Sequence, residues 1–155
     1  MMKIAIGADH AGFDLKEAIK QQLTAEGYQV TDHGTFNHDS VDFPDYALPV
    51  AEDVSQGKAD RGIVVCGNGL GMSYTANKVP GVRAALVNNL ILAVESRKHG
   101  NANVLSLGGR PDTGGIETPL ALTIVETWLK TDFEGGRHAM RLEKIEKIDE
   151  KYRKI

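Results

Sequence analysis

The single cysteine of the chain, Cys66, follows a short apolar run and precedes a glycine-rich turn, Gly67-Asn68-Gly69-Leu70-Gly71. Glycines let the backbone turn tightly and present its N–H groups into a concavity, which binds phosphates or oxyanions at the start of a helix. A helix N-terminus also favours the thiolate, so Cys66 could act as a nucleophile or as a base. The alternatives are a tight turn without a ligand and a buried, inert cysteine. A dinucleotide site is not favoured, because its glycine motif belongs after the first strand.

Two histidines lie in polar segments where they could handle protons or bind phosphate. His10 follows Asp9 directly after the first apolar run, and His99 lies in the polar loop from Lys98 to Asn103. Histidine titrates near neutral pH, which suits both roles, although a cap and a loop residue would also explain Asp9 and His10. No two histidines have the spacing of metal ligands and no carboxylate cluster accompanies them, so we expect no metal.

Two arginines are candidates for a phosphate site. Arg137 and Arg141 are four residues apart and would share one face of a helix. Neighbouring guanidinium groups repel each other unless an anion lies between them, and guanidinium binds phosphate through two hydrogen bonds. The alternative is a pair of solvated arginines. A third arginine, Arg110, follows two glycines after another apolar run, at a chemically unusual strand end.

Length and composition place these residues in one ordinary globular domain. The chain has 155 residues, a formal net charge of -3 and a single cysteine. A slightly acidic chain has no electrostatic footprint for nucleic acid or an anionic membrane, and one cysteine excludes an intrachain disulfide and a cysteine-rich zinc site. No apolar run is long enough to cross a bilayer, and the first residues lack the pattern of a signal peptide. We therefore expect a cytoplasmic protein that binds neither nucleic acid nor membrane.

Short β-branched runs alternate with longer amphipathic stretches, which predicts βαβ units in a single domain over residues 1–155. Strands are predicted at residues 3–6, 28–31, 62–65, 83–87 and 104–107, and helices at residues 12–26, 46–55, 72–77, 91–98 and 116–129. We expect a doubly wound, Rossmann-like α/β domain with a five-stranded, mostly parallel sheet. Ligands of such sheets bind beyond the carboxyl ends of the strands, which gives weight to polar residues that follow strands.

A charged tail, from about residue 138 to 155, carries an apolar stripe formed by Leu142, Ile145, Ile148, Tyr152 and Ile155. This spacing predicts a C-terminal helix. The helix could pack on its own domain, but the five-stranded core is complete without it. We therefore expect the helix to reach a partner subunit.

Six segments, taken in order, are more specific than any one motif. They are Ile-Gly-Ala-Asp-His-Ala-Gly-Phe at 6–13, Asp-Phe-Pro-Asp-Tyr-Ala at 42–47, Cys-Gly-Asn-Gly-Leu-Gly-Met-Ser at 66–73, Ala-Asn-Lys-Val-Pro-Gly-Val-Arg-Ala-Ala at 76–85, Asn-Ala-Asn-Val-Leu at 101–105 and Glu-Gly-Gly-Arg-His at 134–138. Together they resemble the type B ribose-5-phosphate isomerase family, which includes the subunits of galactose-6-phosphate isomerase. The resemblance extends from Lys3 to about Ile148.

The resemblance implies an aldose–ketose isomerase of carbohydrate metabolism, in the pentose phosphate pathway, that uses no metal and no cofactor. Such an enzyme interconverts ribose 5-phosphate and ribulose 5-phosphate through a cis-enediolate. The resemblance also implies a homodimer, or a dimer of dimers, in which each active site is shared between two subunits.

Roles for individual residues follow from the same resemblance. Cys66 would be the base that moves a proton between C2 and C1 of the open-chain sugar, and His99 would help to open the furanose ring. Asp9 would bind a sugar hydroxyl, and Tyr46 would line the pocket. The phosphate would be bound by the side chains of His10, Arg110, Arg137 and Arg141. The anion hole for the enediolate would be formed by the N–H groups of Gly67, Gly69, Leu70 and Gly71. Asn101 would provide one more substrate contact.

Two positions differ from the usual family pattern. Asn68, which we count as catalytic, stands where the family commonly has a threonine whose hydroxyl assists ring opening, and an amide relays a proton less readily. The residue after the ring-opening histidine is often Asn, whereas this chain has Gly100, which could widen the pocket. The alternatives are therefore an isomerase of a hexose 6-phosphate (allose or galactose 6-phosphate) or of a free aldose, and a non-catalytic phosphate-binding module.

Overall fold

Five apolar runs form one parallel sheet in the computed structural model, which describes residues 1–153. The strands are β1 (Lys3–Ala8), β2 (Gln29–Asp32), β3 (Arg61–Cys66), β4 (Ala84–Leu86) and β5 (Val104–Gly108). Their order is β2-β1-β3-β5-β4, and every neighbouring pair is parallel. The chain order reverses between β1 and β3, which is the place where open α/β sheets bind ligands.

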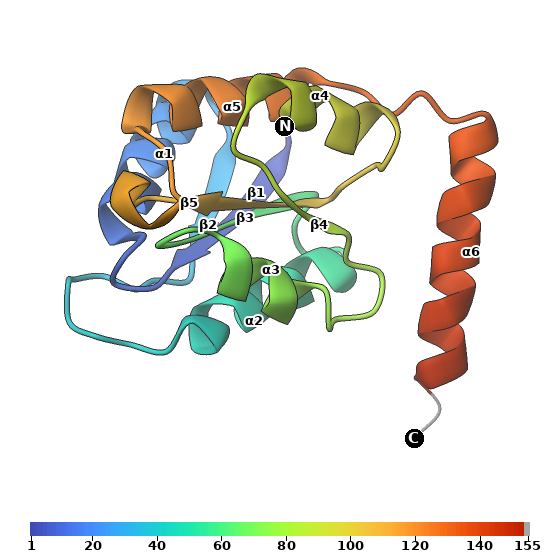
Figure 1. Ribbon diagram of the computed structural model, residues 1–155, viewed down its shortest axis with the longest axis horizontal. Coiled ribbons are helices and arrows are strands. Elements are labelled where there is room, and N and C mark those ends of the chain that lie inside the picture. Colours follow the sequence, from blue (N-terminus) through green and yellow to red (C-terminus); the bar gives the residue numbers. More distant parts are fainter. Residues whose placement is uncertain (154–155) are drawn as a thin grey trace.

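Helices cover both faces of the sheet, as Figure 1 shows. One face carries α1 (Phe13–Ala25), α4 (Leu90–Lys98) and α5 (Thr118–Lys130), and the other carries α2 (Phe43–Ser55) and α3 (Leu70–Ala76). A short 3-10 turn, Pro111–Thr113, follows β5. The strands β1, β3 and β5 are buried over nearly their whole length, as expected for a sheet covered on both faces. None of the described helices is long and apolar enough to cross a membrane.

The expected fold class is confirmed, with shifts at the element boundaries. The second helix begins at Phe43 rather than Tyr46. Pro44 lies in its first turn, where proline is tolerated because a backbone N–H at that position would have no acceptor within the helix. The fourth strand is shorter than predicted, at Ala84–Leu86. The C-terminal helix, α6 (Arg137–Tyr152), begins one residue before the predicted extension.

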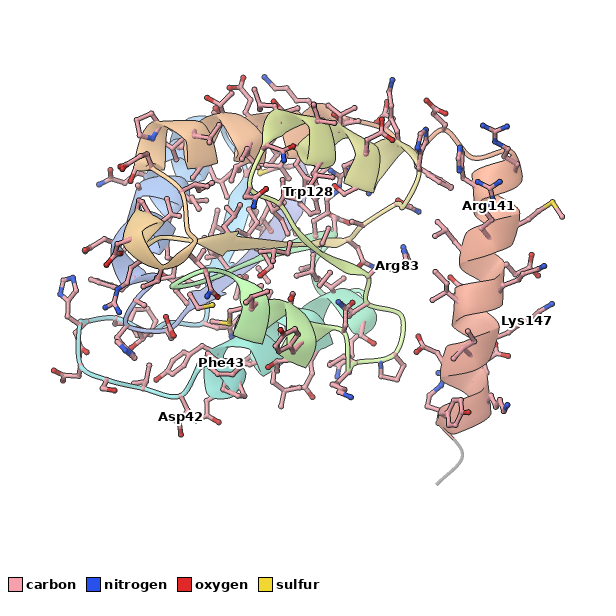
Figure 2. The ribbon with its side chains drawn as sticks, viewed as in Figure 1. Asp42, Phe43, Arg83, Trp128, Arg141 and Lys147 are labelled. Carbon is pink, nitrogen blue, oxygen red and sulfur yellow. The ribbon has the colours of Figure 1, made fainter. Side chains whose placement is uncertain are left out.

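Trp128 is fully buried between α5 and the sheet (Figure 2). The guanidinium carbons of Arg61 and Arg97 lie 5.2 and 5.9 Å from its ring, within the range of a cation–π interaction. Arg61 also donates to the carbonyls of Trp128 and Leu129, and so caps the end of α5. Burial is the main reason why the pKa of Arg97 falls to about 10, which still leaves the guanidinium charged at neutral pH.

The helix α6 stands apart from the layered body, at the end of the molecule opposite to the carboxyl ends of the strands (Figure 1). Polar contacts tie it to its own chain: the Gly81 N–H donates to Asp149, and Arg83 lies 3.9 Å from Glu146. Its apolar stripe is largely exposed, with Ile148 at 58% and Tyr152 at 70% of full exposure. The expected stripe residue Ile155 lies outside the described residues.

Candidate active site

The strand β3 ends at Cys66, and the turn that follows brings a backbone donor onto its sulfur. The Gly69 N–H donates to the Cys66 Sγ over 3.2 Å, and the thiol is buried. Gly69 has φ +88°, a left-handed conformation that favours glycine. The fully buried hydroxyl of Ser106 donates to the Gly69 carbonyl over 2.6 Å and so fixes this residue from the neighbouring strand β5. The turn therefore holds the sulfur and its donor in a defined arrangement.

Asp9 and His10 lie at the end of β1, beside the cysteine turn. The Asp9 N–H donates to the Val65 carbonyl of β3, and the buried Asp9 carboxylate accepts from the Ala11 and Gly12 N–H groups at 2.9 and 3.1 Å. The His10 Nδ1 accepts from the backbone N–H of Val41 at 3.1 Å. This contact needs a lone pair on Nδ1, so the neutral ring carries its proton on Nε2, where it can donate to a ligand.

Asn68 ties the turn after β3 to the turn after β5. Its Oδ1 accepts from the Leu70 N–H at 3.1 Å, and its Nδ2 donates to the Thr113 carbonyl at 3.3 Å. The Arg110 N–H donates to the Gly67 carbonyl at 2.9 Å, which brings this exposed arginine to the same edge. Tyr46, at the start of α2, is half-buried on this side of the sheet, against Gly34. We call Asp9, His10, Cys66, Asn68 and Arg110 the carboxyl-edge group.

His99 lies at the other edge of the sheet. It follows α4 and precedes β5, whose first residue, Val104, pairs with Gly62, whereas Cys66 pairs with Gly108. The start of β5 is therefore roughly 13 Å from the level of Cys66, at about 3.3 Å per residue. Figure 2 shows the same separation: Arg141 on α6 and Phe43, whose ring lies against Gly71, are at opposite ends of the molecule. One chain does not bring His99 or the arginines of α6 to Cys66.

Charged and aromatic side chains surround His99. The His99 Nδ1 lies 2.6 Å from Glu95 Oε2, and its Nε2 lies 3.7 Å from Glu134 Oε2. The His99 ring stacks on the His138 ring, with centroids 4.2 Å apart and an angle of 16° between the planes. Arg141 Nη1 lies 3.5 Å from His138 Nδ1. We call these five residues, Glu95, His99, Glu134, His138 and Arg141, the amino-edge group.

The ring of His138 is favoured in its neutral form. Burial is the main cause of its lowered pKa, and the positive charges of Arg141 and Arg137, together with that of His99 whenever His99 is protonated, act in the same direction. Glu134 opposes them. At neutral pH this ring is therefore a flat, uncharged surface against which His99 stacks.

Ligand atoms of His99, Glu134 and His138 lie within 4.8 Å of one another, the one such set within residues 1–153. Tetrahedral metal coordination needs the lone pairs of its histidine ligands to converge on one point. The two rings are stacked and nearly parallel, so their lone pairs lie in separate planes. The observed arrangement is a stacked pair and not a metal cage.

The loop between α4 and β5 uses the polar groups of Asn101 internally. The Asn101 Oδ1 accepts from Arg97 at 2.9 Å, and its carbonyl accepts from Arg83 at 3.1 and 2.9 Å. Its φ of +43° is left-handed, which Asn tolerates better than most residues. At Gly100 a Cβ atom would lie 2.8 Å from the Ser96 carbonyl oxygen. The close approach of the Ser96 carbonyl therefore favours glycine at position 100, independently of any effect on a pocket.

Sequence reasoning missed Glu95, Glu134 and His138 as members of a site. Glu95 carried a usable signal, because it precedes His99 by four residues, the spacing at which side chains meet on a helix. Glu134 and His138 come from a loop and from α6, and only the path of the chain between α5 and α6 brings them to His99.

Known proteins share this fold and much of this sequence. The sequence model of the Ribose/Galactose Isomerase family matches residues 4–145. Ribose-5-phosphate isomerase B of Escherichia coli (strain K12) is 44% identical over 151 residues, which cover 97% of this chain and 99% of that protein. The structure of Clostridium thermocellum Ribose-5-Phosphate Isomerase B is 54% identical, with a TM-score of 0.94, and the match covers 97% of this chain and 99% of that one.

A further solved structure contains a sugar phosphate. Ribose-5-phosphate Isomerase B from Mycoplasma genitalium, with bound ribulose-5-phosphate, is 40% identical to this chain and has a TM-score of 0.90, with 96% of each chain covered. The family match covers most of the sequence, and the relatives cover 96 to 97% of it. The chain belongs to the ribose/galactose isomerase family.

Proposed function

We propose that this protein is an aldose–ketose isomerase that interconverts ribose 5-phosphate and ribulose 5-phosphate. One observation carries the proposal within the chain: a cysteine sulfur lies at the reversal of strand order, with a backbone N–H 3.2 Å away. Proton abstraction next to a carbonyl needs a base and preorganised donors for the oxyanion that forms. The names of the two isomerases and the ribulose-5-phosphate complex support the same substrate.

In this mechanism Cys66 takes the proton from C2 of the open-chain aldose. The negative charge moves to the carbonyl oxygen, where N–H groups of the turn at residues 67–71 stabilise the cis-enediolate, apart from those of Gly69 and Leu70, which bond the Cys66 sulfur and Asn68. The thiol then delivers a proton to C1, after exchange with solvent in part of the turnovers, and the hydroxyl proton of O2 moves to O1, which gives the ketose. Asp9, hydrogen-bonded by two backbone N–H groups, binds a sugar hydroxyl, and Tyr46 and Asn68 line the pocket.

The remaining steps need residues from the other edge of the sheet. His99 opens the furanose ring, and Arg137 and Arg141, together with His10 and Arg110, hold the phosphate. A pentose phosphate cannot reach both edges of the same chain. We therefore propose a homodimer, or a dimer of dimers, in which the amino-edge group of one subunit meets the carboxyl-edge group of its partner. The exposed apolar stripe of α6 supports this assembly, because such a surface is typical of an interface.

The first test is turnover of ribose 5-phosphate by the purified protein in D₂O. We expect ribulose 5-phosphate to form and deuterium to enter C2 of the recovered aldose. The Cys66→Ala variant should still bind the sugar phosphate but lose both signals. Full activity of that variant would remove Cys66 from the role of base, and binding without labelling by the wild type would indicate a non-catalytic module.

The preferred substrate is tested by comparing kcat/KM for ribose 5-phosphate, allose 6-phosphate, galactose 6-phosphate and free aldoses. We expect ribose 5-phosphate to have the largest value. A larger value for a six-carbon sugar phosphate would leave the family assignment intact and move the substrate to the hexose class.

A further inference from the structure

We propose that Glu95 is a positioning residue, which holds His99 in the form that opens the sugar ring; the inference rests on the proposed function. The evidence is the 2.6 Å contact between Glu95 Oε2 and His99 Nδ1. Glu95 lies in the last turn of α4, and His99 is its C-cap residue, so the helix itself sets the spacing.

The geometry selects one tautomer of the His99 ring. Glu134 lies 3.7 Å from the other nitrogen, Nε2, which is too long for a hydrogen bond. Glu95 is therefore the closer partner, and its carboxylate, 2.6 Å from Nδ1, favours the form of the ring that carries the proton on Nδ1. The neutral ring then has its lone pair on Nε2, the atom that takes a proton from substrate.

The ring-opening step balances around this one atom. Nε2 takes the proton of the O1 hydroxyl, the electron pair left on O1 forms the C1=O1 double bond, and the C1–O4 bond breaks. Nε2 then returns the proton to O4, so the furanose becomes an open-chain aldehyde with a C4 hydroxyl. The imidazolium that exists between the two transfers is stabilised by the negative charge of Glu95, as in other carboxylate–histidine pairs.

The neighbours of His99 keep the ring where Glu95 can act on it. The stack on His138, with centroids 4.2 Å apart, fixes the ring plane, and Arg141 approaches the far side of that stack at 3.5 Å from His138 Nδ1. Lys98 lies 3.8 Å from Glu134, so a cation also offsets the second carboxylate near Nε2. Glu95 is thus the carboxylate whose charge is directed at His99 alone.

Removing Glu95 should not unfold the protein. The side chains of Glu95 and His99 are 46% and 43% exposed, and exposed ion pairs of this kind add little to stability. A loss of activity in a Glu95 variant can therefore be separated from a loss of structure, especially with a matched control. The pair of Glu126 and Lys130 on α5, also four residues apart and 2.7 Å long, provides that control through Glu126→Ala.

Two assays separate ring opening from proton transfer between carbons. Ribose 5-phosphate is a furanose and must open before it reacts. Ribulose 5-phosphate cannot close such a ring, because its C5 oxygen carries the phosphate, so exchange of its C1 proton with D₂O needs only the base. The variants are Glu95→Ala, which removes the acceptor, and Glu95→Gln, which keeps an acceptor without the charge.

We expect Glu95→Ala to slow turnover of ribose 5-phosphate at least about tenfold, within the range of acid–base catalysis, and to leave exchange at C1 of ribulose 5-phosphate within about twofold of wild type. The turnover of ribose 5-phosphate by Glu95→Gln should lie between those of wild type and Glu95→Ala. Glu126→Ala should match wild type in both assays. Unchanged turnover of ribose 5-phosphate in Glu95→Ala, or an equal loss in both assays, overturns the proposal. Failure of the proposed function would give a different result from failure of the Glu95 proposal, because the wild type itself would then convert neither ribose 5-phosphate nor ribulose 5-phosphate.

Discussion

Ser106 fixes the turn that carries the donor to Cys66, the proposed base, from the neighbouring strand. Its hydroxyl is fully buried and holds the carbonyl of Gly69, the residue whose N–H lies on the Cys66 sulfur. The Gly69 carbonyl also accepts from the Ser73 N–H at 3.1 Å, so loss of the Ser106 hydroxyl removes the shorter of its two hydrogen bonds and should let the left-handed turn relax away from the thiol.

We predict that Ser106→Ala lowers kcat for ribose 5-phosphate about tenfold with little change in KM, since preorganised donors act mainly on the transition state. Steady-state kinetics at fixed pH provide the measurement. Ser55→Ala is the control, because the Ser55 hydroxyl also donates to a backbone carbonyl, that of Pro80, but at an exposed position. A larger effect on KM than on kcat would mean that Ser106 supports binding instead.

Asn68 marks a limit of inference from sequence. Sequence comparison identified the amide as a departure at a catalytic position, and its chemistry alone suggested a weaker proton relay. In the structure both ends of the amide are occupied, one by the Leu70 N–H and one by the Thr113 carbonyl. The residue therefore acts as a strut between two turns, which no property of residue 68 itself could reveal, because Thr113 lies 45 residues along the chain.

The pairing of α1 with the end of β2 depends on a buried charge. The Lys16 side chain is fully buried, and its Nζ lies 2.9 and 2.7 Å from the two carboxylate oxygens of Asp32. Burial acts to raise the pKa of Asp32, but hydrogen bonds from Lys16, the Gly34 N–H and Lys20 outweigh it and lower the pKa. The folded state therefore holds this carboxylate in its charged form more strongly than the unfolded chain does.

This shift predicts the acid side of the stability profile. A depressed carboxylate pKa contributes stability above its ordinary value of 3.8, and that contribution is lost as pH falls through the lower folded value. We expect Asp32→Asn to cost about 3 kcal/mol at pH 7, because it leaves the Lys16 charge buried without its partner. The difference from wild type should shrink below about pH 4.

Urea unfolding between pH 3 and 7 measures this effect. Asp14→Asn is the control, since the Asp14 side chain is 83% exposed and its histidine partner, His38, is also exposed. Parallel stability profiles for wild type and Asp32→Asn would show that the buried pair does not contribute in the expected way.

Most helices and strands follow from local patterns, whereas the two halves of the site do not. The rule that polar residues after strands meet at one edge places Asp9, Cys66 and Arg110 together. His99 precedes its strand, so the order of elements already puts it at the other edge. The residues that surround His99 are brought there by Gly135 and Gly136, whose positive φ values of 73° and 59° turn the chain into α6. The spacing of apolar residues in the sequence does not predict such a change in chain direction, because it depends on backbone dihedral angles.

The separation of the two groups predicts that activity belongs to the dimer. Cys66→Ala and His99→Ala each remove a different half of every shared site, so each variant alone should be inactive. Mixing the two under conditions of subunit exchange should restore about a quarter of wild-type activity, because half of the dimers are mixed and each of these has one intact site.

Turnover of ribose 5-phosphate by the equilibrated mixture, against each variant alone, provides the measurement. A mixture of Cys66→Ala with Glu126→Ala is the dilution control, since Glu126 lies on α5 in an exposed pair with Lys130 and this mixture should keep about half of wild-type activity before and after exchange. Mass spectrometry of isotope-labelled subunits reports the exchange itself. No recovery in a mixture that demonstrably exchanges subunits would place both groups in the same site of one chain, contrary to the separation along β5.

Trp128 is the only tryptophan of the chain, and it is fully buried against the sheet between two arginines. Its fluorescence therefore comes from one indole in one environment. Unfolding should expose that ring to water and shift its emission to longer wavelength, whereas release of α6 from the proposed partner subunit should leave the ring covered. The intrinsic emission of the protein, recorded beside its hydrodynamic radius, can therefore distinguish dissociation of subunits from loss of the fold without any added label.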